Sequence, residues 1–220
     1  MTDVIILGAG GTARDLLSWI PAFAAAERPW RCVGLLDDAP ARRGTMVDGF
    51  PVLGPLAAAA GRTDVALIDA LGGPRNFRRR DLILRSAGLD PARFLSLVHP
   101  SAVVAPEVEL GPGCLIYPFA FIGAAARIGA HVTVLSHVAI NHEADVGDFA
   151  ILASHAAVAG RVHIGASAYI GMGACLIQDV TVGARAFVGM GSVVIRPVPA
   201  GATVAGSPAR VIAGTDGSPE

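Results

Sequence analysis

The chain has 220 residues, of which 53 % are hydrophobic and 16 % are charged, and its formal net charge is −1. This length suffices for one or two domains with a buried core, and the nearly neutral charge argues against a nucleic-acid-binding protein. The sequence has neither an apolar run of about 18 residues, which a transmembrane helix needs, nor the pattern of a signal peptide.

The first part of the chain alternates short apolar runs with helical patterns. The apolar runs are Val4–Leu7, Cys32–Leu36 and Val65–Ile68. An amphipathic helix is expected after the first run, and a basic helix is expected to start near Arg75. Strands that alternate with helices predict a small parallel sheet with helices on its faces.

Glycines or acids follow each of the three apolar runs. Gly8 to Gly11 come directly after the first run, Asp37 and Asp38 after the second, and Gly72 after the third. The carboxyl ends of parallel strands share one edge of a sheet, where open α/β sheets bind ligands, and a glycine turn before a helix suits a phosphate. The dinucleotide fingerprint is incomplete, because Ala13 replaces its third glycine. We interpret this edge as a site for a nucleotide sugar; the alternative is a set of tight turns with surface acids.

The second part of the chain repeats with a period of six. The repeated aliphatic residues are Val98, Val104, Leu110, Ile116, Ile122, Ile128, Val134, Ile140, Val146, Leu152, Val158, Ile164, Ile170, Leu176, Val182, Val188 and Val194. A period of six fits neither a helix nor a simple strand, and it predicts a parallel β-helix. Three repeats would form one triangular coil, so that each residue lies above the residue 18 positions earlier, roughly 4.8 Å away.

These patterns divide the chain into three segments. We expect an α/β domain over residues 1–95, a β-helix over residues 96–200, and a C-terminal tail over residues 201–220. The tail is rich in Gly, Pro and Ser, and its end should fray.

The three cysteines indicate the redox state of the compartment in which the protein works. Cys32, Cys114 and Cys175 are scattered, and the last two lie at or beside core positions of the repeat. We therefore expect buried free thiols in a reducing compartment, which is typical of a cytoplasmic protein.

The triplet Asn141-His142-Glu143 lies between two inward positions of the repeat, Ile140 and Ala144. His142 stands two places after an inward aliphatic residue, so its side chain should point outward. An outward imidazole can act as a general base when a carboxylate supports it. Neighbours on a strand point to opposite sides, so Glu143 could reach the imidazole only at a corner or bend. The alternative is an ordinary solvated histidine.

Taken together, these motifs resemble the sugar O/N-acyltransferases of the left-handed β-helix class. This family includes bacterial sialic acid O-acetyltransferases and nucleotide-activated amino-sugar N-acetyltransferases. The resemblance covers nearly all of residues 3–212. The motifs that carry it are Ile6-Leu7-Gly8-Ala9-Gly10-Gly11, Gly34-Leu35-Leu36-Asp37-Asp38, Val98-His99-Pro100-Ser101-Ala102, the hexads, His142-Glu143 and Gly206-Ser207-Pro208-Ala209-Arg210.

The resemblance implies both a fold and an assembly. The fold is an α/β domain similar to half of a dinucleotide-binding (Rossmann) fold, followed by a left-handed β-helix of hexapeptide repeats. The assembly is a homotrimer with active sites between neighbouring β-helices. The family also implies a bacterial, cytoplasmic enzyme of cell-surface polysaccharide biosynthesis that needs no metal.

The resemblance also implies roles for individual residues. His142 falls where the family has its catalytic base, and Glu143 falls where it has the acidic helper. Residues at positions that contact the nucleotide sugar are Gly10, Gly11, Thr12, Asp37, Asp38 and Gly72. Residues along the acetyl-CoA track, which is bound largely through backbone groups, are Ile151, Gly160, Met172 and Met190.

Two positions depart from the family pattern. Thr12 stands where several members have histidine, and Ser154-His155 stands where many have Pro-Gly. His155 follows His137 by 18 residues, so the two rings should stack. They either line the same cleft as His142 or pack at a subunit contact.

Our main hypothesis is an acetyl-CoA-dependent N-acetyltransferase. The acceptor would be the C4 amine of a nucleotide-linked 4-amino-4,6-dideoxy sugar, such as a UDP-bacillosamine precursor or GDP-perosamine. The first alternative is O-acetylation of a sialic acid-like sugar. A zinc protein similar to the γ-class carbonic anhydrases is a more remote alternative, because His137 and His142 have the five-residue spacing of that class but a third ligand is out of step. A scaffold without catalytic activity is the last alternative.

Overall fold

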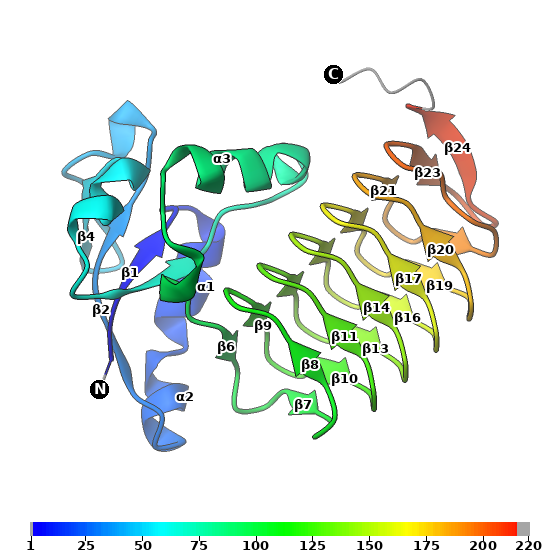
Figure 1. The fold of residues 1–220 in the computed structure, drawn as a ribbon, viewed down its shortest axis with the longest axis horizontal. Coiled ribbons are helices and arrows are strands. Elements are labelled where there is room, and N and C mark those ends of the chain that lie inside the picture. Colours follow the sequence, from blue (N-terminus) through cyan, green and yellow to red (C-terminus); the bar gives the residue numbers. More distant parts are fainter. Residues whose placement is uncertain (1, 215–220) are drawn as a thin grey trace.

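The computed structural model describes residues 2–214 and consists of two parts (Figure 1). A small α/β unit at the N-terminal end is followed by a long stack of two-residue strands. No helix among residues 2–214 is both long and apolar enough to cross a membrane.

The α/β unit is built on a five-stranded sheet with the order β3-β4-β2-β1-β5. Its strands are β1 (Thr2–Leu7), β2 (Trp30–Leu36), β3 (Met46–Val47), β4 (Phe50–Gly54) and β5 (Ala66–Asp69). Strands β1, β2, β4 and β5 run parallel to one another, and three of them, β1, β2 and β5, match the three predicted apolar runs. The short antiparallel hairpin of β3 and β4 was not predicted, although Asp48-Gly49 at its turn is a typical hairpin signal.

Helices cover both faces of this sheet. The helices are α1 (Gly11–Ser18), α2 (Ile20–Ala25) and α3 (Arg80–Ser86), and the 3₁₀ turns are η1 (Pro40–Arg42), η2 (Leu56–Gly61), η3 (Phe77–Arg79) and η4 (Pro91–Arg93). The basic helix expected near Arg75 is thus a 3₁₀ turn followed by an α-helix that begins at Arg80. The turn lies against the β-helix, because the Arg78 guanidinium donates to the carbonyls of Arg185 and Gly201.

The repeats form a left-handed parallel β-helix with three faces. We call them the apolar, the charged and the covered face. The apolar face contains β7 (Val103–Val104), β10 (Phe121–Ile122), β13 (Ala139–Ile140), β16 (Ala157–Val158), β19 (Cys175–Leu176) and β22 (Val193–Val194). The charged face contains β8 (Glu109–Leu110), β11 (Arg127–Ile128), β14 (Asp145–Val146), β17 (His163–Ile164) and β20 (Thr181–Val182). The covered face contains β6 (Leu97–Val98), β9 (Leu115–Ile116), β12 (Thr133–Val134), β15 (Ile151–Leu152), β18 (Tyr169–Ile170), β21 (Phe187–Val188), β23 (Thr203–Ala205) and β24 (Arg210–Ala213).

The register confirms the 18-residue coil. Phe121 pairs with Ala139 and Ala139 with Ala157, each 18 positions further along the chain. The aliphatic residue of each repeat points inward, together with the small residue four places later, and these side chains form one continuous core. Each coil therefore buries its inner face only against its neighbours.

Three corners connect the faces. The first corner, which contains Ser136-His137, leads from the covered to the apolar face. The second, which contains His142-Glu143, leads to the charged face, and the third, which contains Asp148-Phe149, leads back to the covered face. Many corner residues other than glycine have left-handed backbone angles, among them Glu143 with φ +58°.

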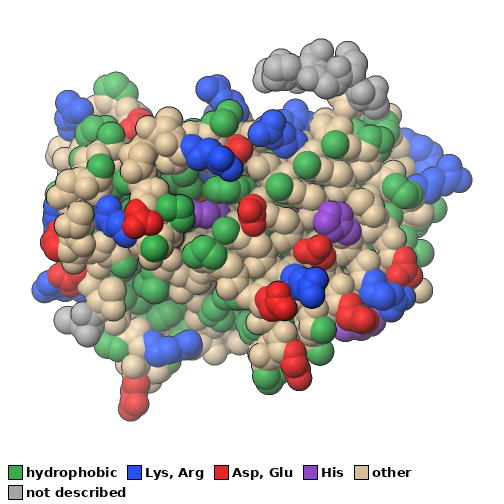
Figure 2. Space-filling view, in the orientation of Figure 1, with side chains coloured by type: hydrophobic (Ala, Val, Ile, Leu, Met, Phe, Trp, Pro, Cys, Tyr) green, Lys and Arg blue, Asp and Glu red, His purple; other side chains and the backbone are tan. Residues whose placement is uncertain are grey.

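The outward side chains give each face its character. On the charged face they are Glu109, Arg127, Asp145, His163 and Thr181, and Figure 2 shows acidic and basic side chains mixed over this part of the molecule. On the covered face most are buried, since the α/β unit and η3 pack against them. On the apolar face they are Val103, Phe121, Ala139, Ala157, Cys175 and Val193, none of which is charged.

The expectation of three buried thiols is wrong for Cys175. Cys32 and Cys114 are buried, and burial raises the pKa of each thiol to about 11. Cys175, in contrast, is exposed. The reason is the two-residue strand: Leu176 takes the inward position, so the residue before it points outward.

Part of the expected C-terminal tail is ordered as strands. β23 pairs in parallel with β21, and β24 folds back antiparallel on β23. Both extend the covered face beyond residue 200. The fraying that we expect at the very end concerns residues outside the described range.

A buried ionic cluster joins the α/β unit to the β-helix. Asp69, at the end of β5, accepts hydrogen bonds from Arg80 at 2.8 Å and from His131 Nδ1 at 2.9 Å. Its other oxygen accepts the Leu71 N–H, and Arg80 also donates to Thr133 of β12. Burial acts to raise the pKa of Asp69, but Arg80 and His131 outweigh this and hold the pKa of the carboxyl below its usual value.

We predict that Asp69→Asn destabilises the protein by about 3–5 kcal/mol, because it leaves the Arg80 guanidinium buried without a counter-charge. Urea unfolding at pH 7 measures this change. Since the lowered pKa of Asp69 stabilises the folded state above about pH 4 and this contribution is lost as the pH falls further, the wild type should lose more stability on acidification than the variant.

The matched control is Asp3→Asn, which removes an exposed ion pair with Arg31. Its effect should be much smaller. Equal destabilisation by the two variants would show that the buried cluster does not hold the two parts together.

Candidate functional site

The groups expected to bind a nucleotide sugar lie at one edge of the sheet. Gly8 follows β1, Asp37 follows β2 and Leu71 follows β5, and these three strands are parallel neighbours. The Ala9 N–H donates to the Asp37 carboxylate at 2.9 Å, which ties the first two groups together. The edge predicted from the sequence is therefore present.

The glycines at this edge differ in what surrounds them. Gly10 and Gly11 are exposed, and a Cβ at either position would meet no atom of the chain within 4 Å. Gly11 begins α1, so these glycines leave open space beside a helix N-terminus. Gly72 is different, because its φ is +122° and a Cβ there would come within 3.0 Å of Ile151. Its backbone conformation and its packing both require glycine.

Asp37 and Asp38 stabilise loops and also line a cavity. Asp37 also accepts the Ala39 N–H, and Asp38 accepts the Leu56 N–H at 2.9 Å. Both residues line a cavity of about 160 Å³ that also contains Arg43. Thr12, half-buried in the first turn of α1, lies beside the open glycines.

His142 and Glu143 lie side by side at the second corner. The left-handed backbone of Glu143 turns its side chain to the same side as the preceding residue, and His142 Nδ1 lies 3.0 Å from Glu143 Oε2. Both side chains are 56 % exposed, so the expectation of an outward imidazole is confirmed. With the carboxylate on Nδ1, the nitrogen that remains for a substrate is Nε2.

Gly160 lies against the imidazole from the next coil. A Cβ at position 160 would come within 2.5 Å of His142 Cε1 and 2.6 Å of Nε2, so the ring uses the space that a side chain would fill. Beside it, Arg161 forms an exposed ion pair with Asp179 at 2.7 Å. Hydrogen bonding to Arg161 lowers the pKa of Asp179. Sequence reasoning missed this pair, although residues 143, 161 and 179 share the 18-residue spacing.

The other residues expected along the acetyl-CoA track lie elsewhere in the single chain. Met172 and Met190 are exposed on successive coils at the first corner. Ile151 lies on the covered face, 4 % exposed, and packs with Phe77 and Tyr169. Its side chain therefore faces the α/β unit, and its N–H donates to the Ala168 carbonyl, so Ile151 does not join Met172 and Met190 at the first corner.

The predicted stack of His137 and His155 is confirmed. The two rings are 4.9 Å apart and nearly parallel, and Phe119 extends the stack by one coil at 5.1 Å. These residues belong to the first corner, whereas His142 belongs to the second. Within the described part of one chain, no three His, Cys, Asp or Glu side chains are close enough to hold a metal ion together.

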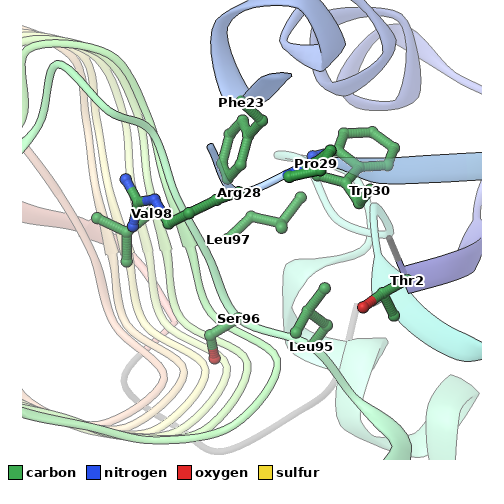
Figure 3. Close-up of a pocket in the computed structure, with 9 residues that line it drawn as sticks. All are labelled: Thr2, Phe23, Arg28, Pro29, Trp30, Leu95, Ser96, Leu97 and Val98. Atoms are coloured by element: carbon green, nitrogen blue, oxygen red, sulfur yellow. The ribbon is translucent and has the colours of Figure 1, made fainter. Parts of the chain in front are cut away.

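Two further cavities lie between the α/β unit and the start of the β-helix. One of about 300 Å³, drawn in Figure 3, lies between Leu97 and the side chains of Phe23 and Trp30. Since Thr2 and Trp30 begin β1 and β2, it lies at the edge opposite to the glycines, and no predicted site residue lines it.

The other cavity was not predicted from the sequence. It has about 230 Å³ and lies between α1 and the first corner. Its lining residues are Asp15, Ser18, Trp19, Tyr117, Pro118, Leu135, Ser136 and Ser154. Burial raises the pKa of Asp15, and the neighbouring Tyr117 hydroxyl reduces this effect. Only the 18-residue spacing of positions 118, 136 and 154 signals that these residues meet.

Comparison with known proteins gave matches among solved structures only. No protein-family model and no curated protein sequence matches the chain. The acetyltransferase domain of PglB from Neisseria gonorrhoeae, solved with acetyl coenzyme A, is 28 % identical with a TM-score of 0.81, over 96 % of this chain and 98 % of that one. WeeI from Acinetobacter baumannii is 27 % identical with a TM-score of 0.79, over 96 % of this chain and 100 % of that one.

A third structure carries the family assignment. The GDP-perosamine N-acetyltransferase PerB from Caulobacter crescentus, solved with CoA and GDP-perosamine, is 30 % identical with a TM-score of 0.81. The match covers 97 % of this chain and 98 % of that one. Structures of that enzyme with one histidine replaced by alanine or by asparagine hold the same two ligands. The agreement over both parts of the chain confirms the resemblance seen in the sequence, and the chain belongs to the sugar N-acetyltransferases of the left-handed β-helix class.

Proposed function

We propose that this protein transfers the acetyl group of acetyl-CoA to the C4 amine of a nucleotide-linked 4-amino-4,6-dideoxy sugar. The observation that carries the proposal is the pair of His142 and Glu143 at an exposed corner above Gly160. The similarity to enzymes that bind acetyl-CoA, CoA and GDP-perosamine supports both substrates.

In the proposed reaction His142 is the general base. Glu143 accepts the Nδ1–H, which leaves Nε2 unprotonated and ready to take the proton of the attacking amine. The N–H of Gly160, which makes no backbone hydrogen bond within residues 2–214, suits the oxyanion of the tetrahedral intermediate. The imidazolium then returns its proton as the thiolate of CoA leaves. No covalent acyl-enzyme is needed.

We assign the two substrates to different parts of the chain. Residues 1–95, which we compare to half of a Rossmann fold, would hold the nucleotide sugar through Gly10, Gly11, Thr12, Asp37 and Asp38. Residues 96–200 would hold acetyl-CoA, with Gly160, Met172 and Met190 along its path. The hollow beside α1, which contains Asp15, offers polar groups for the sugar ring.

The apolar face supports a homotrimer. Its outward residues are uncharged, and Val103 and Phe121 are 60 % and 42 % exposed. Exposed apolar surface of this kind is typical of an interface. This face lies between the first and second corners, so a threefold assembly would bring Met172 of one chain toward His142 of another.

Two alternatives concern the chemistry. O-acetylation would use the same base on a sugar hydroxyl, which is a poorer nucleophile than an amine. A zinc site would need histidines from two chains, such as His137 and His142. Release of CoA should be measured over UDP-, GDP-, dTDP- and CMP-linked sugars with and without a free amine, in a cytoplasmic-type reducing buffer. Turnover of hydroxyl sugars alone would contradict the N-acetyltransferase.

We predict that His142→Asn lowers kcat by about 10²–10⁴, the usual range for the loss of a general base. The KM for acetyl-CoA should change little. The matched control is His163→Asn, because His163 is also exposed and paired with a carboxylate, but on the charged face. Near-normal kcat in a folded His142→Asn protein would exclude this residue as the base.

Glu143→Gln should lower kcat less than His142→Asn does. Loss of the negative charge makes the imidazole easier to deprotonate, so the acidic limb of the pH–rate profile should move to lower pH. Asp145→Asn, which removes the partner of His163, is the control and should leave the profile in place. A Glu143→Gln profile that matches the wild type would mean that Glu143 is only a surface acid.

Gly10→Ala should raise the KM for the nucleotide sugar roughly tenfold, because the methyl group would enter the space proposed for the phosphates. The melting temperature should not fall, since a Cβ there meets no atom of the chain within 4 Å. Gly61→Ala, at a glycine with the same free surroundings, is the control. Equal KM values for the two variants would argue against a phosphate site at Gly10.

Ala157→Arg, in the middle of the apolar face, should prevent trimer formation and abolish activity, because three buried charges would meet at the interface. Light scattering after gel filtration gives the oligomeric state. Thr181→Arg on the charged face is the control and should leave a trimer. A fully active monomer would show that each site is complete within one chain.

A further inference from the structure

A hollow of about 320 Å³ lies where α3 and the loop after it meet the third corner of the β-helix. Its lining residues are Leu84, Arg85, Leu89, Pro91, Phe94, Pro112, Ala130, His131 and Phe149. None of the residues assigned above to the nucleotide sugar, to acetyl-CoA or to the base is among them. The volume is at the lower end of the range for small-molecule sites, which are mostly apolar with a few polar groups.

His131 is the polar group inside this hollow. The residue is 6 % exposed, and its Nδ1 is held by Asp69 at 2.9 Å. One ring face lies parallel to Phe149 at 4.8 Å. The other face is closed by Gly113, where a Cβ would come within 2.7 Å of the ring. The Phe94 ring, which also lines the hollow, packs against the imidazole at a steep angle, with the ring centroids 4.6 Å apart.

The second ring nitrogen has no partner in the protein. No hydrogen bond to Nε2 is found within residues 2–214, yet Nε2 is not among the buried polar atoms without a partner. Since the residue itself is buried, this nitrogen must retain access to the hollow. An imidazole whose Nδ1 is held by Asp69 and whose Nε2 has access to the hollow can form a hydrogen bond with a ligand there.

The charges around the hollow favour an anion. Arg85 is the one lining residue with a formal charge, it is exposed, and it forms no ion pair within the described chain. Asp69 is fully buried and already paired with Arg80. Two acids stand beside lining residues in the sequence: Asp90 accepts the Ala92 N–H at 2.9 Å and Asp148 accepts the Ala130 N–H at 2.8 Å. Neither of them lines the hollow.

We propose that this hollow is a second binding site, independent of the acetyl-transfer site, for a small apolar monocarboxylate. The apolar body would lie among Leu84, Leu89 and Phe94. The carboxylate would accept the Nε2–H of the His131 imidazolium, whose Nδ1–H goes to Asp69, and would face the Arg85 guanidinium. Both ring nitrogens then donate, and the buried cluster gains no unpaired charge.

The test is a titration of the full-length protein with octanoate, with octan-1-ol as the uncharged analogue. Calorimetry should give saturable binding of one octanoate per chain and at least about tenfold weaker binding of octanol. In ¹⁵N-histidine spectra the Nε2 resonance of His131 should shift on addition of octanoate, and saturation with acetyl-CoA should not displace it.

Two variants and one control locate the site. Ala130→Leu fills the hollow and should remove binding, whereas Ala166→Leu, at the same corner position two coils further on, should not. Arg85→Gln, an exposed change that cannot disturb the core, should weaken binding about threefold to tenfold.

Absence of saturable octanoate binding to the wild type would overturn the proposal. Equal affinity for octanoate and octanol, or equal affinity of the Ala130→Leu and Ala166→Leu proteins, would also overturn it. If Ala130→Leu fails to fold, an unchanged affinity of Arg85→Gln together with an unshifted His131 Nε2 resonance would do the same.

Discussion

The coil of 18 residues is the constraint on which the rest of the structure depends. Because every coil has this length, each side chain lies directly above the one 18 positions earlier. Any aliphatic residue that fills the triangular interior of the coil can then occupy the inward position. The outward residues of successive coils form columns on the surface. Such columns place Arg161 over Asp179 at 2.7 Å and His137 over His155 at 4.9 Å. Side chains that are 18 residues apart are therefore neighbours because of the repeat alone, and no loop is needed to bring them together.

The corners add a second effect. A left-handed backbone costs a residue other than glycine roughly 1–2 kcal/mol, and the chain accepts this at many corners. The cost is offset by hydrogen bonds to the coil below, such as the Glu143 N–H to the Ala124 carbonyl at 2.9 Å. In return, consecutive residues point to the same side. This is how Glu143 reaches His142, which two neighbours on a strand cannot do.

These two effects explain how much could be predicted from the sequence. The period predicts the β-helix, the outward His142 and the stack of His137 on His155, because all of these follow from position within the repeat. The strand ends predict the edge with Gly10 and Asp37. The exposure of Cys175 was not predicted. Cys175 lies beside an inward position of the repeat, and it was assigned to the core together with that position.

The contacts between the α/β unit and the β-helix could not be predicted from sequence patterns. Asp69, Arg80 and His131 come from β5, α3 and the third corner, and no spacing in the chain links them. The same is true of Ile151, whose burial depends on how the α/β unit docks on the covered face. Contacts between segments distant in sequence are set by the docked geometry, which a one-dimensional pattern does not contain. The two cavities beside α1 and α3 arise from the same docking, and neither was foreseen.

The three faces of the β-helix indicate where a complete active site can form. A triangular prism has only three sides: here one is covered by the α/β unit, one carries mixed charges, and one is apolar and open. The α/β unit borders the first corner, through the hollow that contains Asp15 and Ser154. His142 stands at the second corner, so the full width of the apolar face separates it from that hollow in its own chain. Packing apolar faces around a threefold axis would bring the first corner of one chain to the second corner of the next. In the assembly that we propose, the contact that buries the apolar face is therefore the same contact that joins acceptor, donor and base.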